Sequence, residues 1–379
     1  MLPKRVYTKI NLDNIKKNMQ TVRKKFGDDM IILGIVKANA YGHGAVETAK
    51  ALVEFGAGML GVAAIDEALE LRDNGITAPV LILGQIFRQD YAAAIENDIT
   101  CTVIDIVTAQ GISKKAQELG KTAKVHIKID TGMGRIGFQP DADGEMQVKS
   151  IFTLDNIFVE GAFTHFANAD TVDKTSAKAQ KKKFLDFTDK LINEGYKIPI
   201  RHMYNSASAM ELDGYAGEMV RCGIMLYGLY PSDEMNKNYK LYSALEFKSH
   251  ISFVKTVGKG FPVSYGSTYI TDREMKIATV PVGYGDGYPR YLSNKGEVLV
   301  HGTRCKILGR VCMDQFMIDV SHLPDVQIAD EVTLVGTDGG ETIMVEDVSD
   351  AEYRFNYEFC CLITPRVPRI YIKDGKVVE

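Results

Sequence analysis

The sequence predicts an α/β protein in which an N-terminal (β/α)8 TIM-like barrel precedes a C-terminal domain rich in β-strands. Two observations predict this fold. Short apolar runs alternate with longer amphipathic segments from about residue 30 to 230, and strand-like segments between Gly and Pro turns follow from about residue 240. A chain of 379 residues suits about two domains. We expect the barrel in residues 1–238 and the β domain in residues 239–379.

Eight apolar runs have the length of buried parallel strands. They are Ile31 to Val36, Gly58 to Ala64, Pro79 to Leu83, Thr100 to Ile104, Ala123 to Ile129, Ile157 to Thr164, Ile200 to Tyr204 and Met219 to Cys222. A doubly wound sheet would show the same alternation, so periodicity alone leaves it open. The polar motifs favour the barrel, because they follow strands one, five, six, seven and eight, whose ends converge on one face of a barrel.

A polar segment, Ser232 to Asn238, predicts a linker after the eighth strand. Beyond it, six segments alternate or run apolar between turns. They are Val254 to Val257, Lys276 to Pro281, Glu297 to Val300, Arg304 to Ile307, Gln315 to Val320 and Glu331 to Val335. These segments predict the separate β domain.

Composition excludes several classes of partner. The formal net charge is −4 and no Lys/Arg-rich block occurs, which argues against nucleic acid. No apolar run has the length of a membrane span, and Met1 to Arg5 lacks the features of a signal peptide, so we expect a cytoplasmic protein. The six cysteines and seven histidines show no metal-ligand spacing, which predicts reduced thiols and no metal site.

The most informative motif is Val36 to Gly44, in which Lys37 ends a predicted core strand. Loss of solvation lowers the pKa of a lysine, whose amine then becomes a nucleophile for carbonyls and later a base. The Gly and Asn residues that follow suit a loop close to a ligand. Alternatively, Lys37 reaches out of an ordinary strand end into solvent.

Four further motifs follow predicted strands. Arg135 lies in a Gly-spaced loop and offers a guanidinium to a carboxylate, His165 follows the sixth strand, and Asn205 or Ser206 can cap a short helix whose amides suit phosphate. Arg221 closes the eighth strand. The first three motifs each have a structural reading when taken alone: an exposed turn, a satisfied core histidine and a plain helix cap.

Together these residues fit a phosphorylated aromatic aldehyde, and pyridoxal phosphate has the required groups. Arg221 would face the ring nitrogen. An Asp at this place would keep the nitrogen fully protonated, whereas Arg221 does not readily give up a proton. The ring would therefore withdraw electrons weakly, which suppresses transamination. Racemisation also needs a base on each face of the α-carbon. Tyrosines in the turns Pro262 to Tyr269 and Gly283 to Arg290 are candidates for the second base, or rim aromatics of plain hairpins.

With these motifs the chain resembles the alanine racemase family over nearly its whole length. Further supporting segments are Gly61 to Ala63 with Glu67 and Ala68, Gly309 to Gln315, Asn356 to Glu358, and Arg366 to Arg369. The resemblance implies a homodimer that interconverts L- and D-alanine with pyridoxal phosphate by two bases and supplies D-alanine for the bacterial cell wall. Lys37 would carry the cofactor and serve D-alanine, and Tyr265 of the other subunit would serve L-alanine.

The resemblance also implies the remaining roles. Phosphate would be held by Tyr41, Ser206, Gly223, Ile224 and Tyr357, and Asn205 would also bind the cofactor. Arg221 would face the pyridine nitrogen, and His165 would bridge Arg221 and Tyr265. Arg135 would contact the cofactor's phenolic oxygen and, with the backbone of Met313 from the partner, the substrate carboxylate. Carbamylated Lys128 would orient Arg135, and the substrate corridor would be lined by Asp170, Tyr284, Arg290 and Arg310.

Ser208 stands where this family often has alanine, so a broader amino-acid or serine racemase stays open. A decarboxylase of the same fold class is less favoured, because it would usually carry a catalytic cysteine in its β domain, whereas Cys312 here precedes Met313. A cofactor carrier would resemble the barrel alone. An aldolase would place its lysine elsewhere and would not use Tyr265.

Overall fold

The computed structural model describes residues 4–349 and 355–378. The chain forms two compact units, each described by itself below. The barrel unit comprises residues 14–40 and 45–242. The β unit comprises the residues up to Asp13, the short segment Tyr41–Gly44 and the residues from Ser243 on.

The barrel unit contains one sheet of eight parallel strands, in the order β8-β7-β6-β5-β4-β3-β2-β9. The strands are β2 (Ile31–Ile35), β3 (Met59–Val62), β4 (Val80–Ile82), β5 (Ile99–Val103), β6 (Ala123–Lys128), β7 (Ile157–Phe163), β8 (Ile200–His202) and β9 (Met219–Cys222). All eight predicted strands are confirmed. The N–H of Glu218 donates to Arg201 O, and the N–H of Arg221 to Tyr204 O, each at 3.1 Å, so the two ends of the sheet meet. Because the two ends of the sheet meet, the fold is the predicted barrel and not an open, doubly wound sheet.

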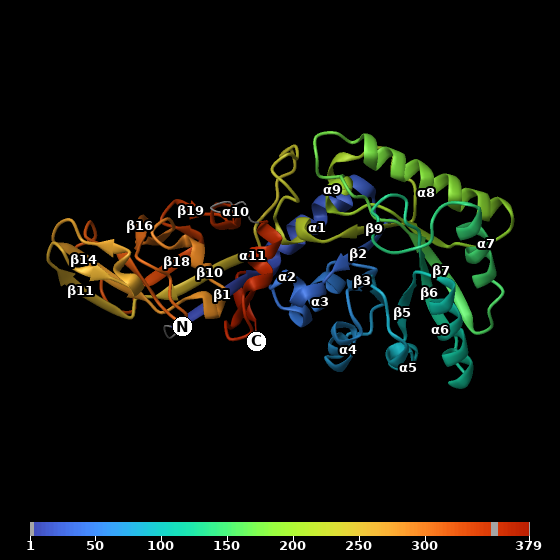
Figure 1. Cartoon of the computed structure of the whole chain (residues 1–379), viewed down its shortest axis with the longest axis horizontal. Coiled ribbons are helices and arrows are strands. Elements are labelled where there is room, and N and C mark those ends of the chain that lie inside the picture. Colours follow the sequence, from blue (N-terminus) through green and yellow to red (C-terminus); the bar gives the residue numbers. More distant parts are fainter. Residues whose placement is uncertain (1–3, 350–354, 379) are drawn as a thin grey trace. The chain divides into compact units, whose positions relative to one another are not determined.

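Helices surround these strands, as Figure 1 shows. They are α1 (Leu12–Phe26), α3 (Ala45–Glu54), α4 (Ile65–Asp73), η1 (Arg88–Asp90), α5 (Tyr91–Glu96), α6 (Ile106–Glu118), α7 (Ala142–Ile151), α8 (Thr175–Asn193), α9 (Ser206–Glu211) and η2 (Ile224–Tyr227). Helix α8 buries Phe184, Phe187 and Leu191, and the burial of such an apolar stripe is what orients an amphipathic helix on a sheet. Parallel strands with helical crossovers present all their carboxyl ends on one face.

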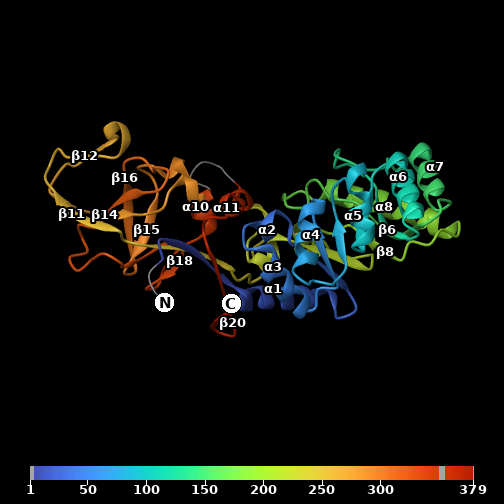
Figure 2. The same cartoon turned by 90° about the horizontal axis from the view of Figure 1, so that it is seen from below.

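The β unit is built on a sheet with the strand order β11-β14-β17-β16-β15-β18-β10-β1-β20-β21, with β19 paired to β18. Its strands are β1 (Val6–Asn11), β10 (Leu245–His250), β11 (Phe253–Val257), β14 (Met275–Val280), β15 (Glu297–Val300), β16 (Thr303–Leu308), β17 (Phe316–Asp319), β18 (Glu331–Asp338), β19 (Glu341–Ile343), β20 (Arg369–Lys373) and β21 (Lys376–Val378). The six predicted strands are confirmed, and Figure 2 shows β11, β14 and β16 among them. A small hairpin of β12 (Pro262–Val263) and β13 (Tyr269–Ile270) lies apart from this order.

The first strand corrects one expectation. The barrel was expected to begin at residue 1, but β1 pairs antiparallel with β10 and parallel with β20. The burial of β1 alternates along its length, so it contributes one face to the core of the β unit. The barrel unit therefore begins at Asn14 within α1, and the two units separate between Tyr242 and Ser243.

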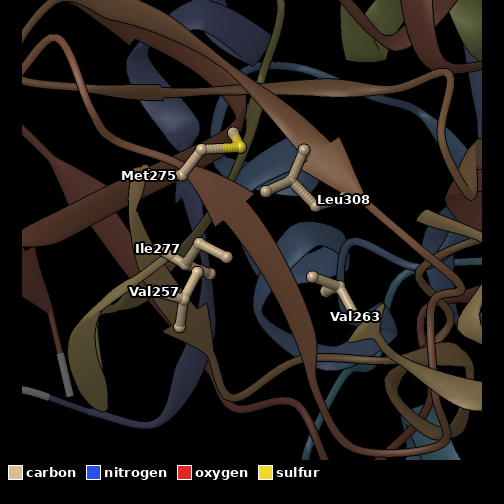
Figure 3. Packing of buried hydrophobic residues seen from close by; sticks show 5 residues of the cluster. All are labelled: Val257, Val263, Met275, Ile277 and Leu308. Atoms are coloured by element: carbon tan, nitrogen blue, oxygen red, sulfur yellow. The ribbon is translucent and has the colours of Figure 1, made fainter. Parts of the chain in front are cut away.

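The β unit has an apolar cluster beside the β12–β13 hairpin. It comprises Val257, Val263, Met275, Ile277 and Leu308, each at most 8% exposed, with Tyr269 and Met317 packed against it. Figure 3 shows these five side chains gathered between the strands. Burial of such side chains contributes about 1.5–3 kcal/mol each, so the cluster fixes the hairpin from which Tyr265 extends.

Within the ranges 4–349 and 355–378, no helix is long and apolar enough to cross a bilayer. Over the same ranges, no group of three or more His, Cys, Asp or Glu side chains is placed to hold a metal ion.

Candidate active site

Lys37 lies at the carboxyl end of β2, directly after Val36. The turn that begins there, α2 (Lys37–Tyr41), is left-handed, with φ angles of 50–53° from Ala38 to Tyr41. Asn39 supports the turn, since its Oδ1 accepts the N–H of Ala45 at 2.8 Å. Lys37 therefore stands at the end of β2, and the backbone that follows it is left-handed and held by specific hydrogen bonds.

The loop after β6 is organised by Asp130, a residue to which sequence reasoning gave no role. Its Oδ1 accepts the N–H groups of Gly132, Met133 and Gly134 at 2.9–3.1 Å, and its Oδ2 accepts that of Arg135 at 3.2 Å. Burial opposes ionisation of Asp130, but these backbone bonds outweigh it and hold its pKa below the ordinary value. The carboxylate thus fixes the backbone from which the exposed Arg135 side chain extends.

Lys128, the last residue of β6, is 2% exposed. Its Nζ donates to Ile129 O at 3.1 Å and lies 5.5 Å from the centre of the Phe163 ring. Burial, together with the charge of Arg221, lowers the pKa of Lys128 to about 8. A side chain at Gly137 would meet Lys128 O at 2.6 Å, so the backbone packs closely against this lysine. Lys128 is therefore a buried amine with a sizeable neutral fraction near neutral pH.

Arg221 is buried at the end of β9 and is held by carbonyl oxygens and imidazoles. Its Nη1 donates to His202 O at 2.9 Å and to His202 Nδ1 at 3.1 Å. Its Nη2 donates to the carbonyls of Thr164 and Met203 and to His165 Nδ1, at 2.8–3.2 Å. Among the side chains that the structure describes, no carboxylate pairs with it. Burial lowers the pKa of Arg221 to about 10, so it stays charged at neutral pH.

His165 follows β7, and its protonation follows from its contact with Arg221. Burial and the charges of Arg221 and Arg135 hold the pKa of His165 well below its ordinary value, so the ring is neutral. Because Nδ1 accepts from Arg221, the proton of the neutral ring is on Nε2. His165 therefore offers an N–H donor on the side away from Arg221.

A second branch runs from Arg221 through the barrel core and was not foreseen from the sequence. His202 Nε2 lies 2.8 Å from His126 Nδ1, and His126 Nε2 lies 3.1 Å from Glu160 Oε2. Arg221 can only donate a hydrogen bond, and the carboxylate of Glu160 can only accept one. His202 and His126 therefore each accept from the Arg221 side and donate toward Glu160. Both imidazoles are 0% exposed, and burial, the largest cause for each, lowers their pKa values. Arg221 is thus anchored through neutral rings with defined tautomers.

The first turn of α9, after β8, and the start of η2, after β9, meet at Ser206. The Oγ of Ser206 accepts the N–H of Gly223 at 2.9 Å and that of Met225 at 3.5 Å, and its own O–H remains to be donated. Asn205 caps α9, with its Oδ1 accepting the N–H of Ser208 at 3.0 Å. Asn205, Ser206, Gly223 and Ile224 therefore form one group of polar atoms in which the Ser206 hydroxyl can donate to an anion.

These residues follow β2, β6, β7, β8 and β9, so they belong to one face of the barrel. Their electrostatics agrees, because the charges of Arg221, Arg135, Lys128 and Lys37 all act on His165. Asp170 lies in the loop after β7, where its carbonyl accepts the Ser232 hydroxyl at 2.5 Å. All the barrel residues named as candidates thus stand on this face or in the loops that form it.

Tyr41 and Tyr357 come together in the β unit. Their rings meet edge to face with centroids 5.7 Å apart, and Tyr357 stands in α11 (Asn356–Leu362). A side chain at Gly42 would lie 2.0 Å from Cys360 O, so only glycine allows this approach to α11. The 41–44 segment thus brings Tyr41 to the helix that carries Tyr357.

Tyr265 stands in η3 (Tyr265–Ser267), and 71% of its surface is exposed. Ser264, with a φ of 65°, donates its hydroxyl to Arg310 O at 2.7 Å. Tyr284 donates its N–H to Cys312 O at 3.1 Å, next to Met313. The β unit therefore gathers Tyr265, Arg310, Met313 and Tyr284. Arg290 is linked to the same group through Ser293. The Ser293 hydroxyl donates to the carbonyl of Arg290 and accepts the N–H of Val311, the residue after Arg310.

Comparison with known proteins identifies the family. The family model "Alanine racemase, N-terminal domain" matches residues 10–231, and "Alanine racemase, C-terminal domain" matches residues 244–371. An alanine racemase of Clostridium perfringens is 47% identical over 99% of this chain and 97% of its own. The solved alanine racemase of Clostridium difficile 630 has a TM-score of 0.96 at 40% identity, covering 100% of this chain and 98% of its own. A histidine racemase of Leuconostoc mesenteroides reaches a TM-score of 0.91 at 28% identity, covering 98% and 99%. The chain belongs to the alanine racemase family.

Proposed function

We propose that the protein is a racemase that interconverts L-alanine and D-alanine with pyridoxal phosphate as its cofactor. The observation that carries the proposal is the barrel face on which Lys37, His165 and the buried Arg221 converge, with no carboxylate paired to that guanidinium among the described residues. Membership of the alanine racemase family supports the choice of reaction.

The donor groups of this face fit the cofactor. The phosphate would be held by Asn205, Ser206, Gly223 and Ile224, with Tyr41 and Tyr357 as further partners. Ser206 supports this assignment, because its hydroxyl accepts two N–H groups and still has a proton to donate. Arg221 would donate to the pyridine nitrogen, and Lys37 would attach the aldehyde carbon. When bound, the cofactor acidifies the Cα–H bond of an attached amino acid.

The chain's own residues would then move one proton on each face of the substrate Cα. Lys37 Nζ, released when substrate displaces it, removes the proton of D-alanine. The hydroxyl of Tyr265 of the partner subunit delivers a proton to the opposite face. For L-alanine the roles reverse: the Tyr265 oxygen anion removes the proton, and the ammonium of Lys37 returns one. Each turnover therefore breaks one Cα–H bond and forms another, with no net change in protons.

Two features support Tyr265 as the second base. Its ring is exposed, so it is free to extend into another subunit. In addition, His165 has its Nε2–H directed away from Arg221, and this donor would stabilise the tyrosine oxygen when it is an anion. We therefore propose a homodimer in which each subunit completes the site of the other.

The substrate carboxylate would be held by Arg135 and by the backbone of Met313 of the partner subunit. Asp170, Tyr284, Arg290 and Arg310 would line the route by which substrate enters. We also propose that the protein acts in the cytoplasm, which suits six cysteines that form no disulfide among the described residues, and that its D-alanine supplies peptidoglycan synthesis.

The test is chiral chromatography of L-amino acids incubated with purified protein and pyridoxal phosphate. The panel includes alanine, serine, histidine, lysine and ornithine, because a methyl-sized difference is worth only about 1–3 kcal/mol of discrimination. Fastest formation of D-alanine supports the proposal, and a faster competitor would change the substrate while keeping the mechanism. Release of amine and carbon dioxide in place of a D-amino acid would refute the racemase assignment.

A further inference from the structure

The turn that follows Lys37 has a conformation that its residues do not favour by themselves. Ala38, Asn39 and Ala40 have φ angles of 52°, 53° and 52°, in the left-handed region where a Cβ crowds the next carbonyl oxygen. Glycine adopts this region freely and asparagine tolerates it, but alanine does so rarely. A run of such residues persists only where surrounding contacts fix it.

One of these contacts comes from the neighbouring loop of the barrel. Glu67 Oε1 accepts the N–H of Ala38 at 2.6 Å, and Glu67 Oε2 accepts the N–H of Ala63 at 2.7 Å. Because Ala38 follows β2 and Ala63 follows β3, one carboxylate joins the loops after two paired strands. Hydrogen bonds to a charged acceptor are about twice as strong as neutral ones.

The usual role of a glutamate in the first turn of a helix explains only one of the two hydrogen bonds that Glu67 accepts. Glu67 lies in the first turn of α4, where glutamate commonly reaches back to an amide at the start of its own helix. The bond to Ala63 serves that purpose. The bond to Ala38 contributes nothing to α4, since Ala38 belongs to another loop, and it holds the first amide after Lys37.

We propose that Glu67 is a positioning residue that fixes the left-handed turn and so aims the side chain of Lys37 from the end of β2. The inference rests on the proposed function, in which Lys37 holds the cofactor. Asn39 assists, because its Oδ1 accepts the N–H of Ala45 and closes the far side of the turn. In this arrangement Glu67 contacts neither cofactor nor substrate, and it acts through the backbone at Ala38.

The experiment measures how fast full-length protein, depleted of cofactor, attaches added pyridoxal phosphate at Lys37. Attachment is followed by the cofactor's absorbance and located by borohydride reduction and peptide mass spectrometry. Glu67→Ala should slow attachment by about 10- to 100-fold, the range for loss of charge-assisted hydrogen bonds. Glu67→Gln, which keeps one accepting oxygen, should lie between this variant and wild type. Glu70→Ala, an exposed position on the same helix, is the matched control.

A rescue variant separates positioning from general damage to the fold. Because glycine adopts a positive φ without strain, Ala38→Gly added to Glu67→Ala should restore most of the attachment rate. Equal rates for Glu67→Ala and Glu70→Ala would overturn the inference, and so would a double variant no faster than Glu67→Ala. If wild-type protein carries no cofactor at Lys37, the proposed function fails, and this inference fails with it.

Discussion

At the scale of single residues, Lys128 has the properties required for a reversible reaction with carbon dioxide. Only the neutral amine of a lysine forms a carbamate, and a pKa of about 8 leaves about a tenth of the groups neutral at pH 7 and half at pH 8. A carbamate would place two oxygens that share one negative charge in the surroundings of Arg221 and Arg135, whose charges already act on Lys128.

We therefore expect Lys128 to carry a carbamate whose occupancy rises from pH 7 to pH 8 at a fixed partial pressure of carbon dioxide. The carbon-13 NMR signal of protein equilibrated with labelled carbon dioxide measures it. Lys128→Ala should abolish the signal. Lys124→Ala, in the same strand but paired with Asp98 at the surface, should leave it unchanged. A signal that survives in Lys128→Ala would contradict the assignment.

At the scale of elements, the chain from Arg221 through His202 and His126 to Glu160 joins β6, β7, β8 and β9 inside the barrel. Glu160→Leu should lower the free energy of unfolding by about 1–3 kcal/mol, because it leaves the buried N–H of His126 without an acceptor. Glu160→Gln keeps an accepting oxygen and should cost less. Urea denaturation of the two variants measures both, and equal losses would show that the acceptor is not what matters.

The same chain predicts how stability depends on pH. The pKa values of His126 and His202 are lowered in the folded state, whereas in the unfolded chain each ring takes up a proton near pH 6.5. Their contribution is therefore fully present above about pH 6.5 and is lost as the pH falls below it. The loss approaches about 1.4 kcal/mol per pH unit for each ring.

Urea denaturation between pH 7.5 and pH 5.5 checks this dependence, with the number of protons taken up on unfolding measured by calorimetry in two buffers. His301→Gln serves as a control, since His301 is exposed and lies in the β unit. A free energy of unfolding that stays constant over this range would show that the two buried rings are not neutral.

Elements and site were predictable from the sequence to different degrees. All eight barrel strands and six strands of the β unit follow from apolar runs and turn residues, which are local signals. Strand β1 was missed because its partners, β10 and β20, lie far along the chain. The motif lysine and arginines could be recognised by type and position. The left-handed turn of Ala38 and Ala40 could not, because alanine gives no signal for it and the Glu67 carboxylate that accepts the N–H of Ala38 comes from another loop.

At the scale of the whole molecule, the proposed dimer makes a prediction about mixtures of inactive subunits. Lys37→Ala should lack attached cofactor, and Tyr265→Phe should keep its yellow cofactor, with both losing racemisation. If each site combines Lys37 of one subunit with Tyr265 of the other, a mixed dimer contains one complete site.

Coexpression of the two variants in equal amounts should therefore restore about a quarter of wild-type activity, since about half of the dimers are mixed and each has one good site of two. Racemisation of L-alanine by the purified mixture measures it, and the separate variants are the controls. No activity in a mixture shown to contain mixed dimers would place Tyr265 and Lys37 in the same subunit or remove Tyr265 from the reaction.

The position of β1 has a consequence for how this protein is made. Residues 14–242 are translated as one stretch and contain the whole barrel unit. The barrel can therefore fold while the β unit is still being synthesised. Val6–Asn11 is synthesised about 360 residues before its parallel partner, Arg369–Lys373. At about 5–20 residues per second the interval is on the order of tens of seconds. During that interval β1 can pair with β10 on one edge, but the edge that pairs with β20 in the finished fold has no partner strand yet.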